Sequence, residues 1–290
     1  MRLSPSPDTK RAAPNSAHVA CETQVAIPDP IDVMGLPIRP LWTDQLVEVL
    51  IARAKAGVRT TAAYANAHTV NLAWSHPAFL TTLCAMDLVY ADGMSVVLAG
   101  KLAGRELPER MTAADYSDWF AGRCAEEGVS LFFLGGEPGV SATAAAELRD
   151  NFPNLKVAGV HHGYFDAGES STVVAAINES GADALLVGMS SPRQEQWVVE
   201  HAAALKTPVI WCVGALFDYY AGREPRGPDW LCRNGGEWLY RLGADPAHKW
   251  RRYLIGNPLF AVRAIGWAWK HRHDGDGTTQ DGKGGGSWQH

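Results

Sequence analysis

Short apolar runs of strand length alternate with segments of helical periodicity along most of this chain, and that alternation limits its fold more than any other feature. The apolar runs lie at 31–38, 62–65, 88–91, 129–134, 155–160, 182–187 and 208–213. A repeated strand-then-helix order predicts an α/β fold of the Rossmann-like class, with a mainly parallel sheet and helices on both faces. We therefore expect functional residues at the carboxyl ends of the strands, where such sheets bind their ligands.

Two of the predicted strands end at polar side chains that could act together. Asn66 follows the run 62–65, and Asp92 with Gly93 follows the run 88–91. Because the carboxyl ends of parallel strands meet in one crevice, we expect the Asn66 amide and the Asp92 carboxylate to share it. The alternative is that Asp92 only caps the helix that begins near Met94, since Asp is a favoured N-cap residue.

Glycine-containing turns follow two later strands. Gly135 and Gly136 precede the helix predicted at 140–151, and Gly188 begins a small-residue turn that leads into a helix carrying Gln194. Such turns let backbone amides approach a phosphate or a ribose, and a helix N-terminus suits a pyrophosphate. An ordinary strand-to-helix turn is the alternative, because Gly is common at such turns. A Pro-broken loop with Arg110 leads through Thr112, a capping residue, into the helix predicted at 113–127.

The composition narrows the function classes. The chain has 290 residues, of which 47% are hydrophobic, so it can bury a large core as one big domain or two modest ones. Its net charge of -5 argues against a general nucleic-acid binder. Five scattered cysteines without CxxC spacing predict neither a disulfide framework nor a zinc site, and they fit a reducing cytosol. The pair His161-His162 has no further ligand at metal-binding spacing, so no metal site is expected.

The chain is predicted to have four parts. Residues 1–30, rich in Pro, Ser and Asp, are expected to form a disordered leader, and 271–290 a disordered tail. Residues 31–229 would form the α/β catalytic domain, and 230–270 a basic, aromatic-rich helical appendage. Residues 231–270 contain seven basic residues and only two acidic ones, although the whole chain is acidic. No run reaches the roughly 18 apolar residues of a membrane span, so we expect this appendage to lie on an anionic membrane surface. The alternative is a solvated helical face with core aromatics.

Several short motifs occur in the order found in one known family. With them, residues 31–260 resemble the WecG/TagA/CpsF glycosyltransferases, also called glycosyltransferase family 26. The motifs are Asn66-Ala67-His68, Ala91-Asp92-Gly93, Phe133-Leu134-Gly135-Gly136, His162-Gly163-Tyr164-Phe165, Gly188 with Pro192-Arg193-Gln194-Glu195, Val213-Gly214 with Phe217-Asp218, Arg226-Gly227-Pro228 and Glu237-Trp238-Leu239-Tyr240-Arg241-Leu242.

The resemblance implies an inverting, metal-independent transferase. It would move a sugar, an N-acetylmannosamine-type or related hexose, from a UDP donor to an undecaprenyl-diphosphate-linked sugar in cell-surface polysaccharide synthesis. Asp92 would be the general base that takes the proton of the acceptor hydroxyl. The substrate-binding residues would be Tyr64, Asn66, Arg110, Gly135, Gly136, Gly188, Gln194, Asp218, Arg241, Arg251 and Arg252.

The same resemblance implies the partners and the location. The UDP-sugar is a co-substrate, no cofactor or metal is expected, and the enzyme would be cytoplasmic and peripheral on the inner face of the bacterial plasma membrane. A homo-oligomer is possible, since exposed aromatics also suit a subunit interface.

Two departures from the family pattern leave other functions open. Tyr64 stands where members typically have Thr, and Ala247-His248 stand where they tend to have arginines. A diverged, non-catalytic relative that binds a nucleotide sugar or a lipid carrier is therefore one alternative. A UDP-sugar dehydrogenase or epimerase is another, although no GxGxxG motif follows the first strand.

Overall fold

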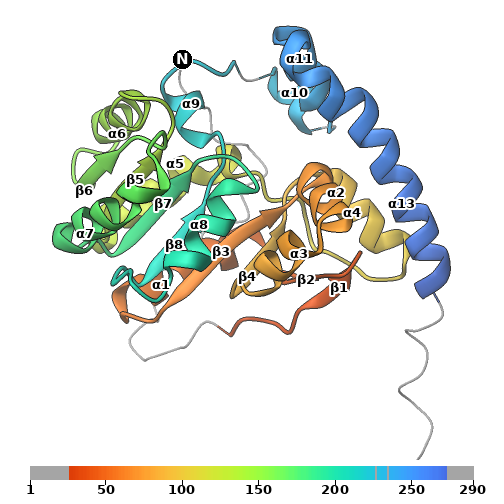
Figure 1. Ribbon diagram of the computed structural model, residues 1–290, viewed down its shortest axis with the longest axis horizontal. Helices are drawn as coiled ribbons and strands as arrows, with labels where there is room; N and C mark the ends of the chain where they lie inside the picture. Colours follow the sequence, from red (N-terminus) through yellow and green to blue (C-terminus); the bar gives the residue numbers. More distant parts are fainter. Residues whose placement is uncertain (1–25, 226, 234, 273–290) are drawn as a thin grey trace, which may run out of the picture.

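The computed structural model describes residues 26–225, 227–233 and 235–272, and its centre is an eight-stranded sheet in the order β1-β2-β4-β3-β8-β7-β5-β6 (Figure 1). Strands β1 and β2 are antiparallel, and the other neighbouring pairs are parallel. The mainly parallel, Rossmann-like sheet predicted from the sequence is confirmed. The strands are β1 Ile31–Val33, β2 Leu36–Ile38, β3 Thr60–Ala65, β4 Leu88–Ala91, β5 Ser130–Gly135, β6 Lys156–His161, β7 Ala184–Gly188 and β8 Val209–Cys212.

The first apolar run is not one strand but a hairpin. Met34 and Gly35 lie between β1 and β2 with φ angles of 57° and 85°, and Asp32 Oδ1 accepts a hydrogen bond from the Gly35 amide at 2.7 Å. Two consecutive residues with positive φ are typical of the tight turns that join antiparallel strands. The run is apolar on both sides of the turn, and this concealed the turn in the sequence.

Helices cover both faces of the sheet, as predicted. Buried residues of α2, α3, α4, α7, α8 and α13 form the core on one face, and those of α1, α5, α6 and α9 form it on the other. The helices are α1 Thr43–Lys55, α2 Ala67–Ser75, α3 Pro77–Cys84, α4 Met94–Leu102, α5 Ala113–Glu127, α6 Val140–Asn151, α7 Ser170–Ser180, α8 Arg193–His201, α9 Leu216–Tyr220, α10 Asp229–Arg233, α11 Glu237–Ala244, α12 Pro246–Trp250, the π-helix η3 Arg251–Ile255 and α13 Gly256–His271, with a 3-10 turn η2 at Ala167–Glu169.

The side chains of strand β8 alternate between the two hydrophobic cores on opposite faces of the sheet. Trp211 packs on the α5 side, while its neighbours Ile210 and Cys212 pack on the opposite side. Trp211 stacks on Tyr116 with the ring centroids 5.8 Å apart, and its indole N–H donates to the Tyr90 hydroxyl at 3.0 Å. Alternating side chains that are all buried explain why the strand lacks the apolar/polar alternation of a half-exposed sheet.

The C-terminal helix α13 lies against α2 and α4 (Figure 1). Asn71 on α2 donates its amide to the Gly256 carbonyl at 2.7 Å, and the Arg263 guanidinium donates back to Asn71 Oδ1 at 2.9 Å. Phe260 and Trp267 are buried in the core of that face. These contacts fix the appendage on the sheet domain, next to the carboxyl ends of β3 and β4.

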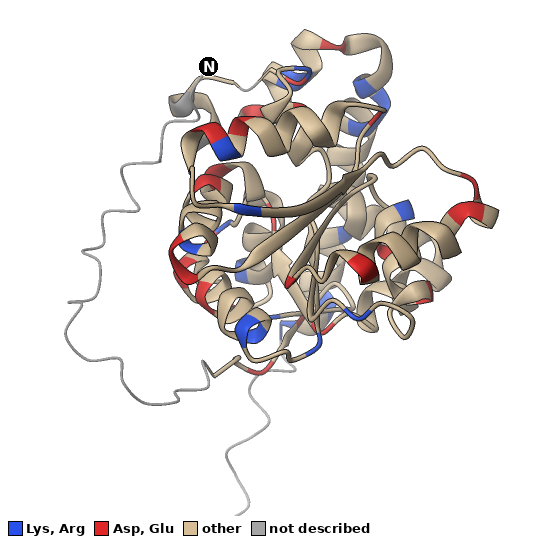
Figure 2. Cartoon of the chain, turned by 90° about the vertical axis from the view of Figure 1, so that its left-hand side faces the viewer, with Lys and Arg blue, Asp and Glu red and all other residues tan. Residues whose placement is uncertain are grey.

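The distribution of charged residues and the hydropathy of the helices both concern contact with a membrane. Figure 2 shows Lys and Arg interspersed with Asp and Glu over the helices on the side drawn. None of the helices formed by the described residues is long and apolar enough to span a bilayer. The predicted leader and tail lie mostly outside the described residues, and the four-part division stays a prediction.

Candidate active site

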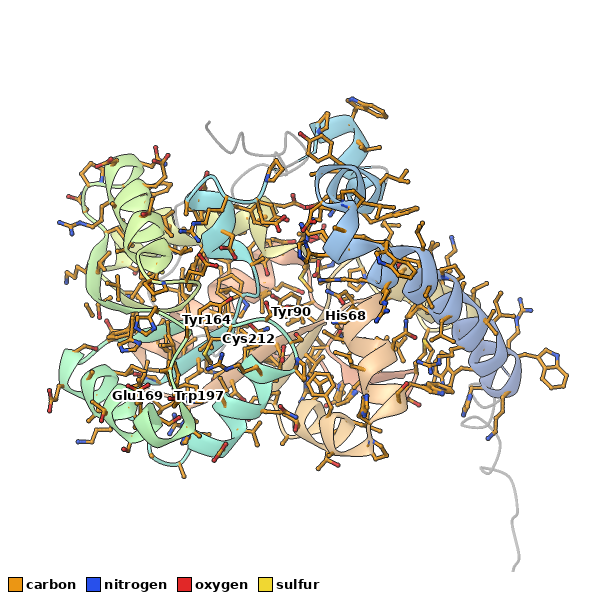
Figure 3. The ribbon with its side chains drawn as sticks, turned by 45° about the horizontal axis from the view of Figure 1, so that its top comes forward. His68, Tyr90, Tyr164, Glu169, Trp197 and Cys212 are labelled. Atoms are coloured by element: carbon orange, nitrogen blue, oxygen red, sulfur yellow. The ribbon has the colours of Figure 1, made fainter. Side chains whose placement is uncertain are left out.

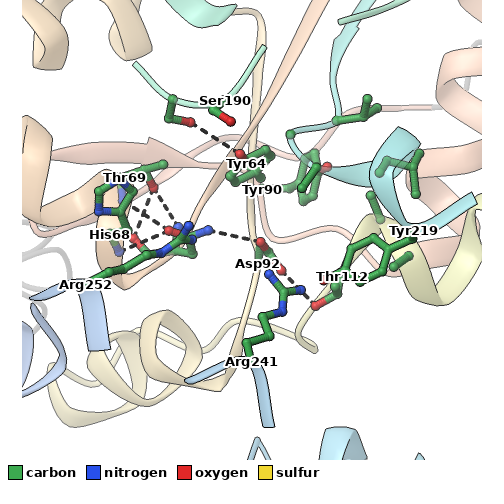
Figure 4. A pocket seen from close by; sticks show the side chains of 18 residues that line it. Tyr64, His68, Thr69, Tyr90, Asp92, Thr112, Ser190, Tyr219, Arg241 and Arg252 are labelled. Atoms are coloured by element: carbon green, nitrogen blue, oxygen red, sulfur yellow. Dashed lines mark hydrogen bonds between the residues drawn. The ribbon is translucent and has the colours of Figure 1, made fainter. Parts of the chain in front are cut away.

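A pocket opens at the carboxyl ends of four adjacent strands, β4, β3, β8 and β7 (Figure 4). Asn66 directly follows β3, Asp92 directly follows β4, and Ser191 and Gly214 lie in the turns after β7 and β8. Arginines of the C-terminal segment reach the same pocket. Its lining is Tyr64, Asn66, His68, Thr69, Tyr90, Asp92, Thr112, Ala113, Ala114, Ser190, Ser191, Val213, Gly214, Ala215, Leu216, Tyr219, Arg241 and Arg252.

Asn66 and Asp92 meet in this pocket, as the strand ends predict. In the β3–β4 register Ala65 faces Ala91, so the next residues of both strands lie side by side. Asn66 Oδ1 accepts the amides of His68 and Thr69 at 3.0 and 3.1 Å, which caps α2. The Asn66 amide nitrogen therefore faces Asp92 and donates to its Oδ2 at 3.2 Å. Asn66 thus positions Asp92 while it caps the helix.

The second oxygen of Asp92 is held by a residue that the sequence indicated only as a helix cap. Thr112 Oγ1 donates to Asp92 Oδ1 at 2.8 Å. Thr112 occupies the N-cap position of α5, yet its side chain makes no capping hydrogen bond. No signal in the sequence links it to Asp92, because the loop before α5 brings the two together. The alternative that Asp92 only caps α4 is wrong, because Gly93 is the N-cap residue of α4 and no side chain makes a capping hydrogen bond there.

Opposing effects act on the Asp92 carboxyl. The pKa of Asp92 is raised overall, chiefly by burial and also by the Glu237 charge, whereas the hydrogen bonds from Thr112 and Asn66 and the Arg241 charge lower it. A carboxylate that receives two donors yet lines a cavity keeps free lone pairs for a third partner. The Asp92 carboxyl group is thus fixed in place, and its role as a general base stays a prediction.

Two arginines bring positive charge to the pocket. Arg241 pairs with Glu237, Nη2 to Oε1 at 2.5 Å, and lies over the Tyr219 ring at 5.2 Å. Arg252, on η3, is exposed and lines the pocket beside His68 (Figure 4). Burial first, and then the Arg252 charge, lower the pKa of His68 to about 4. His68, seen near the C-terminal helices in Figure 3, is therefore neutral near pH 7.

Tyr64 lines the pocket, and Gln194 supports it from behind. Gln194 Nε2 donates a hydrogen bond to the Tyr64 hydroxyl at 3.2 Å, and Gln194 Oε1 accepts one from the Gly214 backbone amide at 3.1 Å. The Tyr64 hydroxyl also lies 3.3 Å from Ser191 Oγ. Gln194 is fully buried and is not among the lining residues. The Gln194 amide thus holds Tyr64 and the turn after β8, and its direct contact with substrate stays a prediction.

The sequence model of the glycosyl transferase WecG/TagA/CpsF family matches residues 31–274. The chain belongs to this family. It is 31% identical over 201 residues to N-acetylglucosaminyldiphosphoundecaprenol N-acetyl-beta-D-mannosaminyltransferases of Staphylococcus aureus strains MRSA252 and NCTC 8325 / PS 47, covering 69% of this chain and 77% of each relative. The resemblance found in the motifs is thereby confirmed. The chain is an enzyme, a glycosyltransferase, and the dehydrogenase or epimerase alternative is set aside.

The glycines of this glycosyltransferase pack strands rather than line the pocket. A Cβ on Gly135 would lie 2.2 Å from the Gly188 carbonyl oxygen, and one on Gly188 would lie 2.8 Å from the Gly214 carbonyl oxygen. The Gly136 amide donates to the Gly188 carbonyl at 3.0 Å. The ends of β5, β7 and β8 therefore approach more closely than any side chain permits. Nucleotide contact by Gly135, Gly136 and Gly188 stays a prediction.

Three further predicted binding residues of the glycosyltransferase lie outside the pocket lining. Arg110 bonds Thr112 at 3.0 Å and pairs with Asp115 at 3.1 Å. Asp218 lies in α9, where its carbonyl accepts backbone amides of the following loop. Arg251 lies over the Trp250 ring at 5.3 Å. Within the described part of the chain no group of three His, Cys, Asp or Glu side chains is placed to hold a metal ion.

Proposed function

We propose that this glycosyltransferase moves an N-acetylmannosamine-type hexose from a UDP donor to a polyprenyl-diphosphate-linked N-acetylglucosamine, with inversion and without a metal ion. The names of the two staphylococcal relatives support the transferred sugar and the lipid-linked acceptor. The observation that carries the proposal is Asp92, held by Asn66 and Thr112 inside a pocket lined by two arginines.

In the proposed reaction Asp92 accepts the proton of the acceptor hydroxyl as that oxygen attacks the anomeric carbon. The O–H bond breaks, the new C–O bond forms, and the bond from the anomeric carbon to the phosphate oxygen breaks, so its electron pair leaves with UDP. Attack opposite to the leaving group inverts the anomeric carbon. A fixed carboxylate makes the alcohol a better nucleophile, which contributes roughly 10²–10⁴-fold to such reactions.

Negative charge grows on the diphosphate as UDP leaves. Arg252 and Arg241 line the pocket that contains Asp92, and neutral His68 adds no charge there. Positioned guanidinium groups stabilise developing phosphate charge through bidentate hydrogen bonds. The two arginines would therefore act in place of the divalent cation that many nucleotide-sugar enzymes bind.

A donor screen tests this function. The full chain, an undecaprenyl-diphosphate N-acetylglucosamine analogue with a short lipid and a set of UDP-sugars are incubated with EDTA, and UDP release and product are measured. We expect turnover with a UDP-N-acetylmannosamine-type donor and a β-linked product from the α-linked donor. An α-linked product, or activity only after Mg²⁺ is added, would contradict the mechanism. UDP release from none of the donors would contradict the proposed donor and acceptor.

We also propose that the C-terminal helices bind the inner face of the plasma membrane. Val262, Ile265 and Trp269 on α13 are 68%, 61% and 84% exposed, and Lys270 and Arg272 next to them are exposed too. Exposed apolar side chains beside basic residues suit an anionic lipid surface. Not every aromatic residue of this aromatic-rich appendage is available for lipid: Tyr253, Phe260 and Trp267 are buried, because that side of the appendage packs on the protein.

Sedimentation with anionic vesicles checks the membrane proposal. The double variant Val262→Glu, Ile265→Glu should bind phosphatidylglycerol vesicles at least about tenfold more weakly, since two aliphatic side chains no longer enter the lipid. Val58→Glu, at an exposed valine between α1 and β3, is the matched control and should bind like the parent protein. Equal binding of all three proteins would place the contact elsewhere.

A further inference from the structure

The loop before α5 runs along the end of β4 and brings Thr112 to Asp92. The Met111 amide donates to the Ala91 carbonyl at 2.7 Å, and the Met111 side chain is buried in the core. Thr112 follows Met111 on the loop, and Asp92 follows Ala91 at the end of the strand. This backbone bond therefore places Thr112 next to Asp92. The Asp115 amide donates to the Thr112 carbonyl at 2.7 Å, so the start of α5 fixes the backbone of Thr112 as well.

Hydrogen-bond chemistry sets the direction of the Thr112 hydroxyl. Arg110 Nη1 lies 3.0 Å from Thr112 Oγ1, and a guanidinium can only donate. The Thr112 oxygen therefore accepts from Arg110, and its single hydrogen is left for Asp92 Oδ1 at 2.8 Å. A bond between a hydroxyl and a carboxylate is strong, and a cation that donates to the hydroxyl polarises it further.

Arg110 itself is held away from the pocket. Its side chain is 16% exposed, and it pairs with Asp115, which is 22% exposed, at 3.1 Å. Arg110 is not among the residues that line the pocket, whereas Thr112 and Asp92 both are. The guanidinium is therefore better placed to act on Thr112 than on a substrate.

We propose that Thr112 is a positioning residue for sugar transfer, and that Arg110 acts on the reaction through the Thr112 hydroxyl instead of binding substrate. This inference rests on the proposed function, because it requires Asp92 to be the base. Asn66 holds one carboxylate oxygen and Thr112 holds the other, so together they fix the plane of the carboxyl group. The lone pairs that remain are then held in a fixed orientation in the pocket that Asp92 lines.

The relay of hydrogen bonds from Arg110 through Thr112 to Asp92 also acts against burial, which raises the pKa of Asp92 overall. The Thr112 hydrogen bond lowers the pKa of Asp92 against the effect of burial, so loss of that bond raises the pKa. A general base works above its pKa, and the acidic limb of the rate profile must then move to higher pH. The titratable or charged groups that interact electrostatically with Asp92 include Tyr64, Tyr90, Tyr116, Glu237 and Arg241, and His68, Tyr219 and Arg252 line the same pocket.

Two substitutions at Thr112 test the hydroxyl. Thr112→Val, of nearly the same shape, should lower kcat about 10- to 100-fold, as expected for losing a hydrogen bond to a charged group, and move the acidic limb upward in pH. The KM for the donor should change little. Thr112→Ser keeps the hydroxyl and should restore most of kcat and the original profile. An unchanged pH profile in Thr112→Val, or no rescue by serine, would overturn the proposal.

A double-mutant cycle tests whether Arg110 acts through Thr112. Arg110→Met should lower kcat in the parent protein but have almost no further effect in the Thr112→Val background. Arg110→Lys retains a cationic donor and serves as the conservative control if the methionine variant folds poorly, which circular dichroism would reveal. Equal losses in both backgrounds, or a raised KM for the donor, would mean that Arg110 contacts substrate.

A titration of Asp92 separates this inference from the proposed function. The ¹³C carboxyl signal of Asp92, assigned by its loss in Asp92→Asn, reports the pKa without any substrate. We expect a higher pKa in Thr112→Val than in the parent protein or in Thr112→Ser. An unchanged pKa would overturn the relay even if transfer is observed, whereas failure of every donor would overturn the proposed function and leave this result intact.

Discussion

Replacing Asp92 with alanine is expected to abolish sugar transfer while UDP binding persists. Loss of a general base typically costs roughly 10²–10⁴-fold, and no other carboxylate is among the residues that line the pocket. Single-turnover product formation measures the loss, and calorimetric titration with UDP measures binding. Similar transfer by Asp92→Ala would remove Asp92 from the mechanism.

Asparagine at the same position should be as inactive, for an additional reason. Thr112 and Asn66 donate to separate oxygens of Asp92. An asparagine has one side-chain oxygen, so one of the two donors would face its NH₂ group. The site is thus built for a carboxylate rather than for any polar group of that size. Asp150→Asn, at an exposed carboxylate on α6, is the matched control and should keep full activity.

The pairing of Asn66 with Asp92 was accessible to sequence reasoning because it needs only adjacent parallel strands. Both residues directly follow an apolar run, and β3 pairs with β4 in the sheet. The insertion of β8 between β3 and β7 was not accessible, because strand order depends on long-range packing and not on local pattern. That order is what brings Ser191 and Gly214 to the pocket.

One physical reason explains why the sequence did not predict what several side chains contact. Gln194 and Thr112 occupy the start of a helix, where a polar side chain reads the same in the sequence whether it faces a substrate, the helix backbone or the protein interior. Only the loop path that bonds Met111 to Ala91 directs Thr112 to Asp92. In the same way, Phe260 and Trp267 share α13 with exposed apolar residues, and only the packing against α2 and α4 decides which side is buried.

Adjacent arginines on η3 should differ sharply in their effect on the donor. Arg252→Ala is expected to weaken UDP binding and raise the donor KM about 10- to 100-fold, the usual loss for a charged hydrogen bond to phosphate. Arg251→Ala changes the net charge equally but should have little effect, since Arg251 lies over Trp250 and not in the pocket lining. Equal losses in both variants would indicate a general charge effect instead of a specific contact.

The pKa of His68 gives the Arg252 prediction a readout that needs no substrate. Arg252 is the second cause, after burial, of the lowered pKa of His68. Removal of the cation should therefore raise the His68 pKa, while burial still keeps it below its ordinary value; Arg251→Ala should leave it unchanged. Proton NMR titration of the His68 ring measures both. If Arg252→Ala weakened UDP binding without moving this pKa, the guanidinium would act from outside the pocket, and the proposed stabilisation of the leaving diphosphate would depend on Arg241 alone.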